Sequence, residues 1–280
     1  MNKRTSAILG IFVIILCLSL DSGLYATVML FGSDTDTQEL FIIDTTDAGT
    51  TKVGSFEVEG VMAGLAYDAN NDIMYGTTTR TDKLYSIDYT TGNAALIGDL
   101  GASFMHGLAY DNSADILFGT YGSSEGDGLY QIDVSTGNST LIGNIGHFYE
   151  DHLNTVSGLA VHPLTNDLYG IIGGPDNVSA LVKIDKTTGS GTFLYEYSIP
   201  NLEGLTFLQD GTLYATDNWS GNLYLLDILS DSTQLMGDTG LGNALGLTSV
   251  PEPATIMLMG LGGLIVIRRR KCAKFRLCLF

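Results

Sequence analysis

Short apolar runs recur along most of the chain, and clusters of aspartate, asparagine, threonine and glycine separate them. Comparison of the chain with itself shows a repeat of about 44 residues that contains two elements. The first, typified by KLYSIDYTTGNAALIG, occurs at residues 39–54, 83–98, 128–143, 180–195 and 222–237. The second, typified by GLAYDNSADILFGT, occurs at residues 64–77, 107–120, 158–171 and 204–216. Each element has two apolar runs around a polar turn and predicts a β-hairpin, so each repeat predicts four short strands.

The predicted strands are apolar on both faces, and this property separates two all-β architectures. Side chains alternate between the faces of a strand, yet Tyr85 and Ile87 on one face and Leu84 on the other are all apolar. In a β-sandwich one face of each sheet meets water, whereas each blade of a β-propeller packs between two neighbours. The pattern therefore favours a propeller, with a pair of β-sandwiches as the alternative.

The two ends of the repeat region complement each other. Residues 243–250 match the GLAYD strand but lack the strand that follows it, and residues 28–33 match that missing strand. Joined in one blade, the two ends close a ring and leave no strand edge open at either terminus. We predict an all-β, five-bladed β-propeller whose N- and C-terminal strands share one blade. Its body covers residues 27–249, between a segment at 1–26 and a tail at 250–280.

The first segment has the layout of a secretory signal peptide. Lys3 and Arg4 precede an apolar run at residues 7–20, and Ala26 supplies a small residue at the expected cleavage point. The run is shorter than the ~20 residues that a spanning helix needs, which disfavours the alternative of a retained N-terminal anchor. We therefore expect the chain to be exported.

The charge of the body excludes one class of partner. It contains 29 acidic residues against five basic ones, a net charge of −24, and such a field repels nucleic acid and favours cations. Cys17, Cys272 and Cys278 all lie outside the body, so no disulfide can stabilise it. A domain of this size can fold without one.

Aspartates recur in the predicted turns, and we interpret them as structural. A carboxylate at the end of a strand can accept the N–H groups of its own turn, and Gly92, Gly137 and Gly189 can adopt the left-handed conformation that follows. The segments DANND at 68–72 and DNSAD at 111–115 have the spacing of a calcium loop but lack its glycine and distal glutamate. Turn formation is again the favoured interpretation. The recurring turn aspartates are Asp44, Asp88, Asp133, Asp185 and Asp227.

The longer, more irregular loops are expected at one face of the ring, where the second-to-third and blade-to-blade connections lie. Variable loops on a rigid scaffold are where binding sites usually occur. Trp219, the only tryptophan, either stacks on a sugar ring or fills a seam between blades. The candidate ligand-binding residues in these loops are Trp219, Asp217, Glu125 and Asp127.

One loop also carries a weak candidate for a metal site. His147, Glu150, Asp151 and His152 lie close together in the sequence, but their spacing matches no defined zinc motif, and a solvated polar loop is the alternative. We predict no cofactor, with Ca²⁺ or another divalent cation as the alternative.

No catalytic motif is found in the body. It has no G-x-S-x-G elbow, no phosphate-binding glycine loop and no cysteine nucleophile. His106 and His162 occupy positions of the repeat and are interpreted as structural. We do not expect an enzyme, although active sites of propellers are assembled from distant loops and lack such motifs.

The tail combines three features in a fixed order. Pro251, Glu252 and Pro253 interrupt regular structure, and the 14 apolar residues at 254–267 follow. As a helix this run would be about 21 Å long against a hydrocarbon core of ~30 Å, so we predict a short transmembrane helix extended by snorkelling side chains. The basic cluster that follows would stay on the cytoplasmic side, and it consists of Arg268, Arg269, Arg270 and Lys271.

This arrangement resembles the PEP-CTERM sorting signal, and the body resembles the propeller-like repeats often attached to it. The resemblance implies recognition by an exosortase in the inner membrane of an exopolysaccharide-producing Gram-negative bacterium, and cleavage near the Pro-Glu-Pro step. It makes Pro251, Glu252 and Pro253 the recognition motif, residues 254–267 the anchor and the basic cluster the stop. The extension CAKFRLCLF at 272–280 departs from the usual pattern.

These observations favour a non-enzymatic protein of the cell surface or biofilm matrix, held transiently in the inner membrane. Its expected partners are an exosortase-type protease and an exopolysaccharide or surface protein, and nucleic acid is excluded. One alternative is an extracellular metal-assisted hydrolase or lyase that uses the loop face. Another is an acidic spacer with no ligand.

Overall fold

The computed structural model describes residues 28–102, 105–121, 127–149, 155–174 and 177–251. Within these ranges the chain forms twenty β-strands and no helix. The strands make five four-stranded antiparallel sheets. Residues 28–250 form one compact unit. The predicted signal peptide and transmembrane helix lie outside the described residues.

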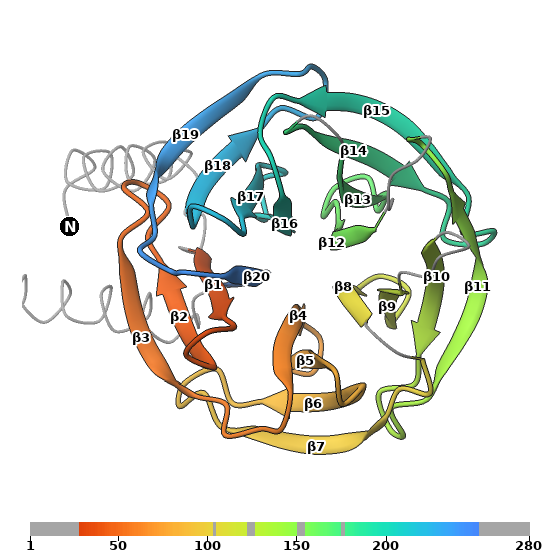
Figure 1. Ribbon diagram of the computed structural model, residues 1–280. Coiled ribbons are helices and arrows are strands. Elements are labelled where there is room, and N and C mark those ends of the chain that lie inside the picture. The colour runs from red at the N-terminus through yellow and green to blue at the C-terminus, as the bar shows by residue number, and fades with distance from the viewer. Residues whose placement is uncertain (1–27, 103–104, 122–126, 150–154, 175–176, 252–280) are drawn as a thin grey trace, which may run out of the picture. The chain divides into compact units, whose positions relative to one another are not determined.

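The five sheets are arranged as blades around a centre (Figure 1). Blade 1 has the strand order β20-β1-β2-β3, with β20 (Ala244–Pro251), β1 (Val28–Asp34), β2 (Glu39–Ile43) and β3 (Thr50–Ser55). Blade 2 comprises β4 (Val61–Asp68), β5 (Ile73–Thr79), β6 (Lys83–Ile87) and β7 (Ala94–Asp99). Blade 3 comprises β8 (Met105–Asp111), β9 (Ile116–Tyr121), β10 (Asp127–Ile132) and β11 (Ser139–Gly146). Blade 4 comprises β12 (Val156–Val161), β13 (Leu168–Gly173), β14 (Ser179–Ile184) and β15 (Gly191–Tyr197), and blade 5 comprises β16 (Leu202–Phe207), β17 (Leu213–Asp217), β18 (Asn222–Leu226) and β19 (Thr233–Asp238).

The predicted five-bladed propeller is confirmed, including the blade shared by the two ends of the body. Strand β20 pairs with β1 in blade 1, although more than 200 residues separate them along the chain. The side chain of Ser33 in β1 accepts a hydrogen bond from the Gly246 N–H in β20 over 2.9 Å. The alternative of two β-sandwiches is therefore excluded.

Apolar side chains fill each seam between neighbouring blades, as the two-faced pattern predicted. Leu84 belongs to the cluster between blades 2 and 3, whereas Tyr85 and Ile87 on the opposite face belong to the cluster between blades 1 and 2. All three side chains are buried. Each blade thus buries both of its faces, and the hydrophobic core consists of five seams.

Glycines of the inner strands allow neighbouring blades to approach closely around the ring. A Cβ added to Gly158 in β12 would lie 2.2 Å from the Glu203 carbonyl oxygen of β16, and one added to Gly246 in β20 would lie 2.7 Å from the Ala63 oxygen of β4. The other inner strands repeat this contact with the next blade through Gly64, Gly107 and Gly204. The glycine of the GLA sequence is therefore a packing residue of the hub.

A second set of glycines makes a similar contact at the outer edge. A Cβ added to Gly98 in β7 would lie 1.9 Å from the Thr136 carbonyl oxygen in the β10–β11 turn of the next blade. Gly54, Gly143 and Gly237 make the equivalent contact at three other seams. At the seam between blades 4 and 5 the position is Tyr195, whose hydroxyl donates to the Leu229 carbonyl oxygen over 2.7 Å.

The turn aspartates have the structural role that the sequence predicted. Asp88 Oδ1 accepts hydrogen bonds from the Thr90 hydroxyl and N–H, and these bonds hold the pKa of its carboxyl below the ordinary value. Gly92 follows with a φ of 83°. In each of the other four β-hairpins of this type, the turn aspartate accepts the N–H of the residue two positions later, as Asp44, Asp133, Asp185 and Asp227 do.

His162 replaces aspartate in the β12–β13 turn, and it makes the same contacts. Its Nδ1 accepts the N–H groups of Leu164 and Thr165 over 3.1 and 3.2 Å. Asp111 accepts the corresponding N–H groups in the β8–β9 turn. The structural interpretation of His162 is therefore confirmed.

Threonine hydroxyls are buried between the blades. One of them links two neighbouring blades by a hydrogen bond, and another has no hydrogen-bond partner among the described residues. Thr120 in β9 accepts from the Gly107 N–H over 3.1 Å and donates to the Val156 oxygen of the next blade over 2.7 Å. The corresponding hydroxyl of Thr77 in β5 is buried and makes no hydrogen bond with any described residue.

Valine at these two positions is expected to have opposite effects. Thr77→Val removes an unsatisfied hydroxyl at constant shape, so the free energy of unfolding should stay unchanged or rise by about 1 kcal/mol. Thr120→Val orphans an N–H group and a carbonyl, so it should lower that free energy by about 2 kcal/mol. Urea unfolding of both variants tests the pair. Equal losses would mean that the Thr77 hydroxyl has a partner, such as a bound water.

Candidate functional site

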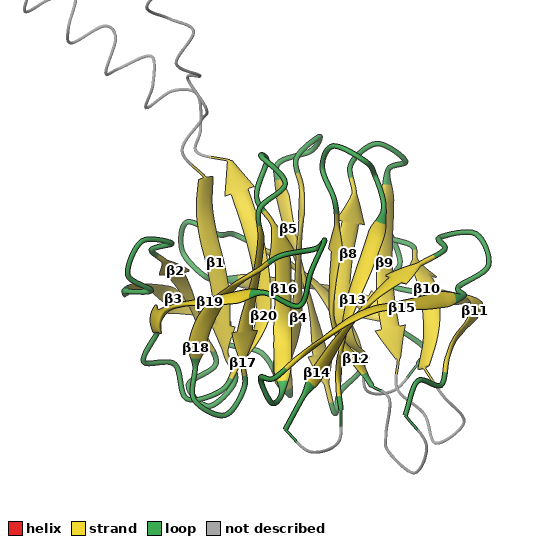
Figure 2. Ribbon diagram, turned by 90° about the horizontal axis from the view of Figure 1, so that it is seen from above, coloured by secondary structure: helices red, strands yellow, loops and turns green. Residues whose placement is uncertain are grey.

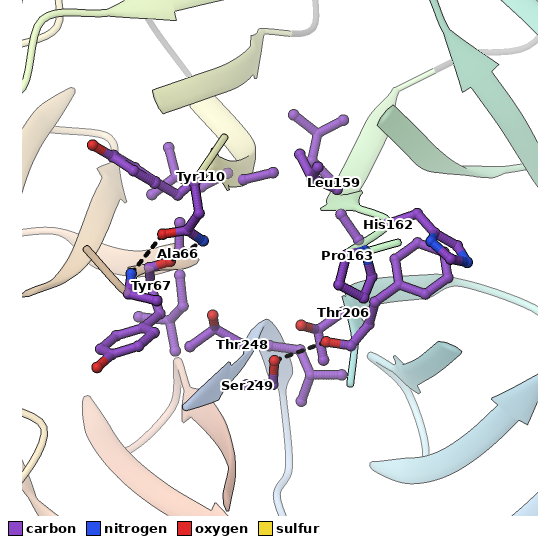
Figure 3. Close-up of a pocket in the computed structure, with 18 of the residues that line it drawn as sticks. Ala66, Tyr67, Tyr110, Leu159, His162, Pro163, Thr206, Thr248 and Ser249 are labelled. Atoms are coloured by element: carbon purple, nitrogen blue, oxygen red, sulfur yellow. Dashed lines mark hydrogen bonds between the residues drawn. The ribbon is translucent and has the colours of Figure 1, made fainter. Parts of the chain in front are cut away.

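A cavity of about 340 Å³ opens at the centre of the ring, at the face that carries the first-to-second strand turns (Figure 3). Chain reversals gather at two opposite faces of the ring (Figure 2), and this one is called here the turn face. The ends of the inner strands and the turns after them form the cavity wall. The sequence led us to expect a site at the other face, the loop face.

The wall is apolar on one side and hydroxylated on the other. One position of the repeat is alanine in three neighbouring inner strands, as Ala66, Ala109 and Ala160, and all three line the cavity. The same position is Thr206 in β16 and Thr248 in β20. Neither threonine hydroxyl hydrogen-bonds to another described residue, so both are available to a ligand. The next residue of β20, Ser249, donates to the Phe207 carbonyl oxygen over 2.7 Å (Figure 3).

Two tyrosines on the alanine side are held in place by carboxylates. The Tyr67 hydroxyl donates to Asp72 over 2.5 Å, and the Tyr110 hydroxyl donates to Asp115 over 2.7 Å. Burial and the neighbouring carboxylates raise the pKa of both phenols, so they remain protonated. The Tyr110 ring also stacks on Tyr75 with a centroid separation of 5.9 Å. Both rings extend away from the centre of the cavity (Figure 3).

Among the described residues, no aspartate, glutamate, lysine or arginine lines the cavity. The lining polar groups are hydroxyls, carboxamides and the His162 ring, which lies 4.7 Å from the Phe207 ring. A neutral cavity is unexpected in a body with 29 acidic and five basic residues. This electrostatic contrast points to an uncharged ligand, because a buried charge would find no counter-charge there.

A compact polar cluster lies beside the cavity, between blades 3 and 4. Lys186 Nζ lies 2.5 Å from Oδ2 of the fully buried Asp111. In the amide orientation that satisfies its neighbours, Asn166 donates to Asp111 Oδ1 over 2.9 Å and its oxygen lies 3.0 Å from Lys186 Nζ. Burial opposes ionisation of Asp111, but the contacts with Lys186 and Ser113 outweigh it and lower the pKa of the carboxyl.

The candidate ligand-binding residues of the loops are not brought into one site. The Trp219 side chain is 67% exposed, so it fills no seam, and the backbone N–H of Trp219 donates to Asp217 Oδ1. Asp217 is buried and also accepts from Ser220, so its carboxylate is used by the turn. Asp127 belongs to another blade, and Glu125 lies outside the described residues.

Asp127 is buried because it connects two blades. It is 2% exposed, and its Oδ2 accepts the Val156 N–H at the start of β12. Gln38 and Ser179 accept the corresponding N–H groups of Met62 and Leu202 at other seams. Burial raises the pKa of Asp127 to about 7, and the hydrogen bond from the Val156 N–H opposes the shift only in part.

Other titratable groups lie at the loop-face ends of the inner strands. Burial lowers the pKa of His106 in β8 and raises the pKa of Glu203 in β16. Glu203 accepts a hydrogen bond from the Asn218 amide over 2.9 Å.

The predicted metal loop is described only in part. His147 directly follows β11, whereas Glu150, Asp151 and His152 lie outside the described residues. Within the described ranges, no group of three or more histidine, cysteine, aspartate or glutamate side chains is arranged to hold a metal ion. The same ranges contain no helix long and apolar enough to cross a membrane.

Sequence reasoning missed the cavity, although one signal for it was present. The residue two positions after the inner-strand glycine is always alanine or threonine, as at Ala66 and Thr248. Such small residues at one position of every repeat leave space at the hub. The search for function among variable loops overlooked this regular position.

Residues 249–271 match the family model of the PEP-CTERM protein-sorting motif. The motif is recognised by exosortase, and it indicates an exported protein that is held transiently in the membrane before its release at the surface. Of the predicted sorting residues, Pro251 ends β20. Glu252, Pro253 and the basic cluster lie outside the described residues.

Solved structures share the fold of the body. A chain in the crystal structure of a nidogen/laminin complex matches 80% of this chain over 98% of its own length, with a TM-score of 0.54 and 12% identity. A protein of unknown function from Bacteroides thetaiotaomicron matches 74% of this chain, with a TM-score of 0.52 and 18% identity, and the match spans 54% of that protein. Identities this low show the fold alone. None of the curated proteins matches the sequence.

Proposed function

We propose that this exported protein is a non-enzymatic binding module of the cell surface, which holds a neutral sugar unit of an exopolysaccharide in the turn-face cavity. The observation that carries the proposal is the neutral lining of that cavity in a strongly acidic body. The sorting motif supports the location, since exosortase substrates are released at the surface.

The two-sided wall suits a pyranose ring. A sugar ring has an apolar face that packs on aromatic and aliphatic groups, and its hydroxyls need hydrogen-bond partners. The alanine side offers the first surface, and the free hydroxyls of Thr206 and Thr248 offer the second. The volume also lies in the range of about 300–1,000 Å³ that small-ligand sites occupy.

A binding role without hydrolysis is supported by the chemistry of the lining. Most glycoside hydrolases need two carboxyl groups beside the scissile bond, one as acid and one as base or nucleophile. No carboxyl group of the part of the chain that the structure describes lines this cavity. A bound glycan would therefore be held and left intact.

Calorimetric titration of the protein with a neutral and an acidic polysaccharide tests the proposal. The neutral polymer should bind with little dependence on salt, because no charge is neutralised. Thr206→Val combined with Thr248→Val should weaken binding about tenfold or more, through the loss of two hydrogen bonds. Thr192→Val, on the exposed outer strand β15, serves as the matched control and should bind like the original protein.

Two results would contradict the proposal. One is binding of the neutral polymer that the double variant leaves unchanged. The other is heat on addition of Ca²⁺ or Zn²⁺ together with cleavage of the polymer, which would favour a metal-assisted hydrolase or lyase.

A further inference from the structure

The cluster of Lys186, Asn166, Asp111 and Ser113 contains the parts of an amide-forming reaction. Lys186 offers a primary amine 3.0 Å from the carboxamide oxygen of Asn166. Asp111 contacts both reactants, with Oδ2 2.5 Å from Lys186 Nζ and Oδ1 2.9 Å from the amide nitrogen of Asn166. The Ser113 oxygen lies 2.7 Å from the Asn166 oxygen and 2.8 Å from Asp111 Oδ1, to which its hydroxyl donates before the reaction. Nucleophile, acyl group, acid–base residue and oxyanion donor are thus in contact.

Two departures from the repeat create this arrangement. Asn166 occupies the position of Asp72 and Asp115, and all three residues share a φ of about 60°. Asp72 and Asp115 are carboxylates that hold tyrosine hydroxyls, whereas Asn166 is a carboxamide facing an amine. Lys186 in turn occupies a position that the other copies fill with residues 45, 89, 134 and 228, none of them cationic. In blade 4 a carboxamide therefore replaces the carboxylate of blades 2 and 3, and a lysine lies beside it.

We propose that Lys186 and Asn166 join in an intramolecular isopeptide bond, with release of ammonia. A proton passes from the Lys186 ammonium to Asp111, and Nζ attacks Cγ of Asn166. The oxyanion that forms on Oδ1 is stabilised by the Ser113 hydroxyl. Asp111 then protonates the amide nitrogen, the Cγ–Nδ2 bond breaks, and Asp111 takes a second proton from Nζ and passes it to the departing ammonia. The products are a secondary amide and ammonium, with Asp111 ionised again, so atoms and charge balance without a co-reactant.

Burial of the cluster reduces the cost of the first proton transfer, which starts from an ionised Asp111 because Lys186 and Ser113 keep the pKa of its carboxyl below the ordinary value. Asp111 is fully buried and the side chain of Lys186 is 21% exposed, and a low-dielectric site reduces the preference for an ion pair over a neutral pair. Asn166 and Ser113 also line the cavity, so ammonia has a path to solvent. Asp111 touches the reacting atoms and is a catalytic residue of this step.

The bond would tie together two turns of blade 4 in a body that has no cysteine. It links the β12–β13 turn to the β14–β15 turn at the turn face. A cross-link between residues 20 positions apart restricts the unfolded chain as a disulfide does. It also removes one cation, which makes the body more acidic by one charge.

Mass spectrometry of the full-length protein after digestion by a protease that cleaves before aspartate tests the proposal. The separate products are peptides 151–166 and 185–209, which contain Asn166 and Lys186 respectively. The expected result is one linked species whose mass is the sum of the two less about 17 Da, the mass of ammonia. Cyclisation of Asn166 to a succinimide also loses ammonia but leaves the peptides separate.

Three variants complete the test. Lys186→Arg keeps the positive charge beside Asp111 and should abolish the linked species, and Asp111→Asn should abolish it by removing the acid–base group. Lys183→Arg is the matched control, since Lys183 pairs with the carboxylate of Asp167 over 2.9 Å and lies outside the cluster. It should keep the link. Separate peptides from the unmodified protein, or a linked species in Lys186→Arg, would overturn the proposal.

Discussion

Alanine at Gly98 is expected to lower the free energy of unfolding by about 3 kcal/mol or more. The added Cβ would lie 1.9 Å from the Thr136 carbonyl oxygen of the next blade. That oxygen cannot move aside easily, because the turn that carries it is fixed. Gly137 has a φ of 84°, and its N–H donates to the backbone carbonyl oxygen of Asp133 over 2.8 Å. Ser139 also fixes the turn by donating to the Leu100 carbonyl oxygen over 2.6 Å. Relief of the clash would have to open the seam between blades 2 and 3.

Gly173→Ala is the matched control for this prediction. It adds the same methyl group to a strand, but the nearest atom would lie 3.7 Å away, an ordinary contact distance. Urea unfolding followed by fluorescence should show a loss of stability for Gly98→Ala and a change of less than about 0.5 kcal/mol for Gly173→Ala. Equal stabilities would mean that the outer seams are looser than the structure indicates.

The number of blades could be predicted from the sequence because each end of the repeat region lacks the strand that the other end supplies. Residues 243–250 and 28–33 are two halves of one hairpin, and only a ring brings them together. The burial of both strand faces was predictable for a similar reason. Leu84 and Tyr85 are adjacent and both apolar, and only an element packed on both sides buries both.

The function of the glycines could not be derived in the same way. Gly64 and Gly98 recur in the sequence as faithfully as Gly92, but a glycine needed for close packing looks the same as one needed for a left-handed turn. The distinction depends on which backbone lies opposite, and that is set by the next blade. Gly92 has a φ of 83°, whereas Gly64 and Gly98 are strand residues without a left-handed φ.

The turn-face cavity was not predicted, because loop variation and regular strand positions draw attention to opposite faces of a propeller. Variable loops gather at the loop face and led us to Trp219 and Asp217. The free hydroxyls and anchored rings lie at the turn face instead, contributed by the regular inner strands. The polar cluster was also not predicted. In the sequence Asn166 and Lys186 are ordinary turn residues, and only the fold shows that Asp111 of the neighbouring blade contacts both of them.

Asp127 is expected to make the protein less stable as the pH rises from about 4 to about 7. The pKa of Asp127 is about 7 in the folded protein against an ordinary value of 3.8 for an aspartate carboxyl, so the folded state binds more protons in this window. The free energy of unfolding therefore falls with increasing pH, by up to roughly 4 kcal/mol from this group alone. Above about pH 7 Asp127 is ionised in both states, and its contribution no longer changes with pH. The physical cause is desolvation of a carboxyl group that is buried at the seam between two blades.

Asp127→Asn isolates this contribution. The amide oxygen can still accept the Val156 N–H but does not titrate, as with the Gln38 oxygen that accepts the Met62 N–H. Other groups also change stability with pH, and the lowered pKa of His106 acts in the opposite direction, so the informative quantity is the difference between the two proteins. Urea unfolding at several pH values between 4.5 and 8 should show the variant gaining relative stability as the pH rises. Parallel curves would mean that Asp127 ionises normally, and that the seam between blades 3 and 4 admits enough water to solvate its carboxylate.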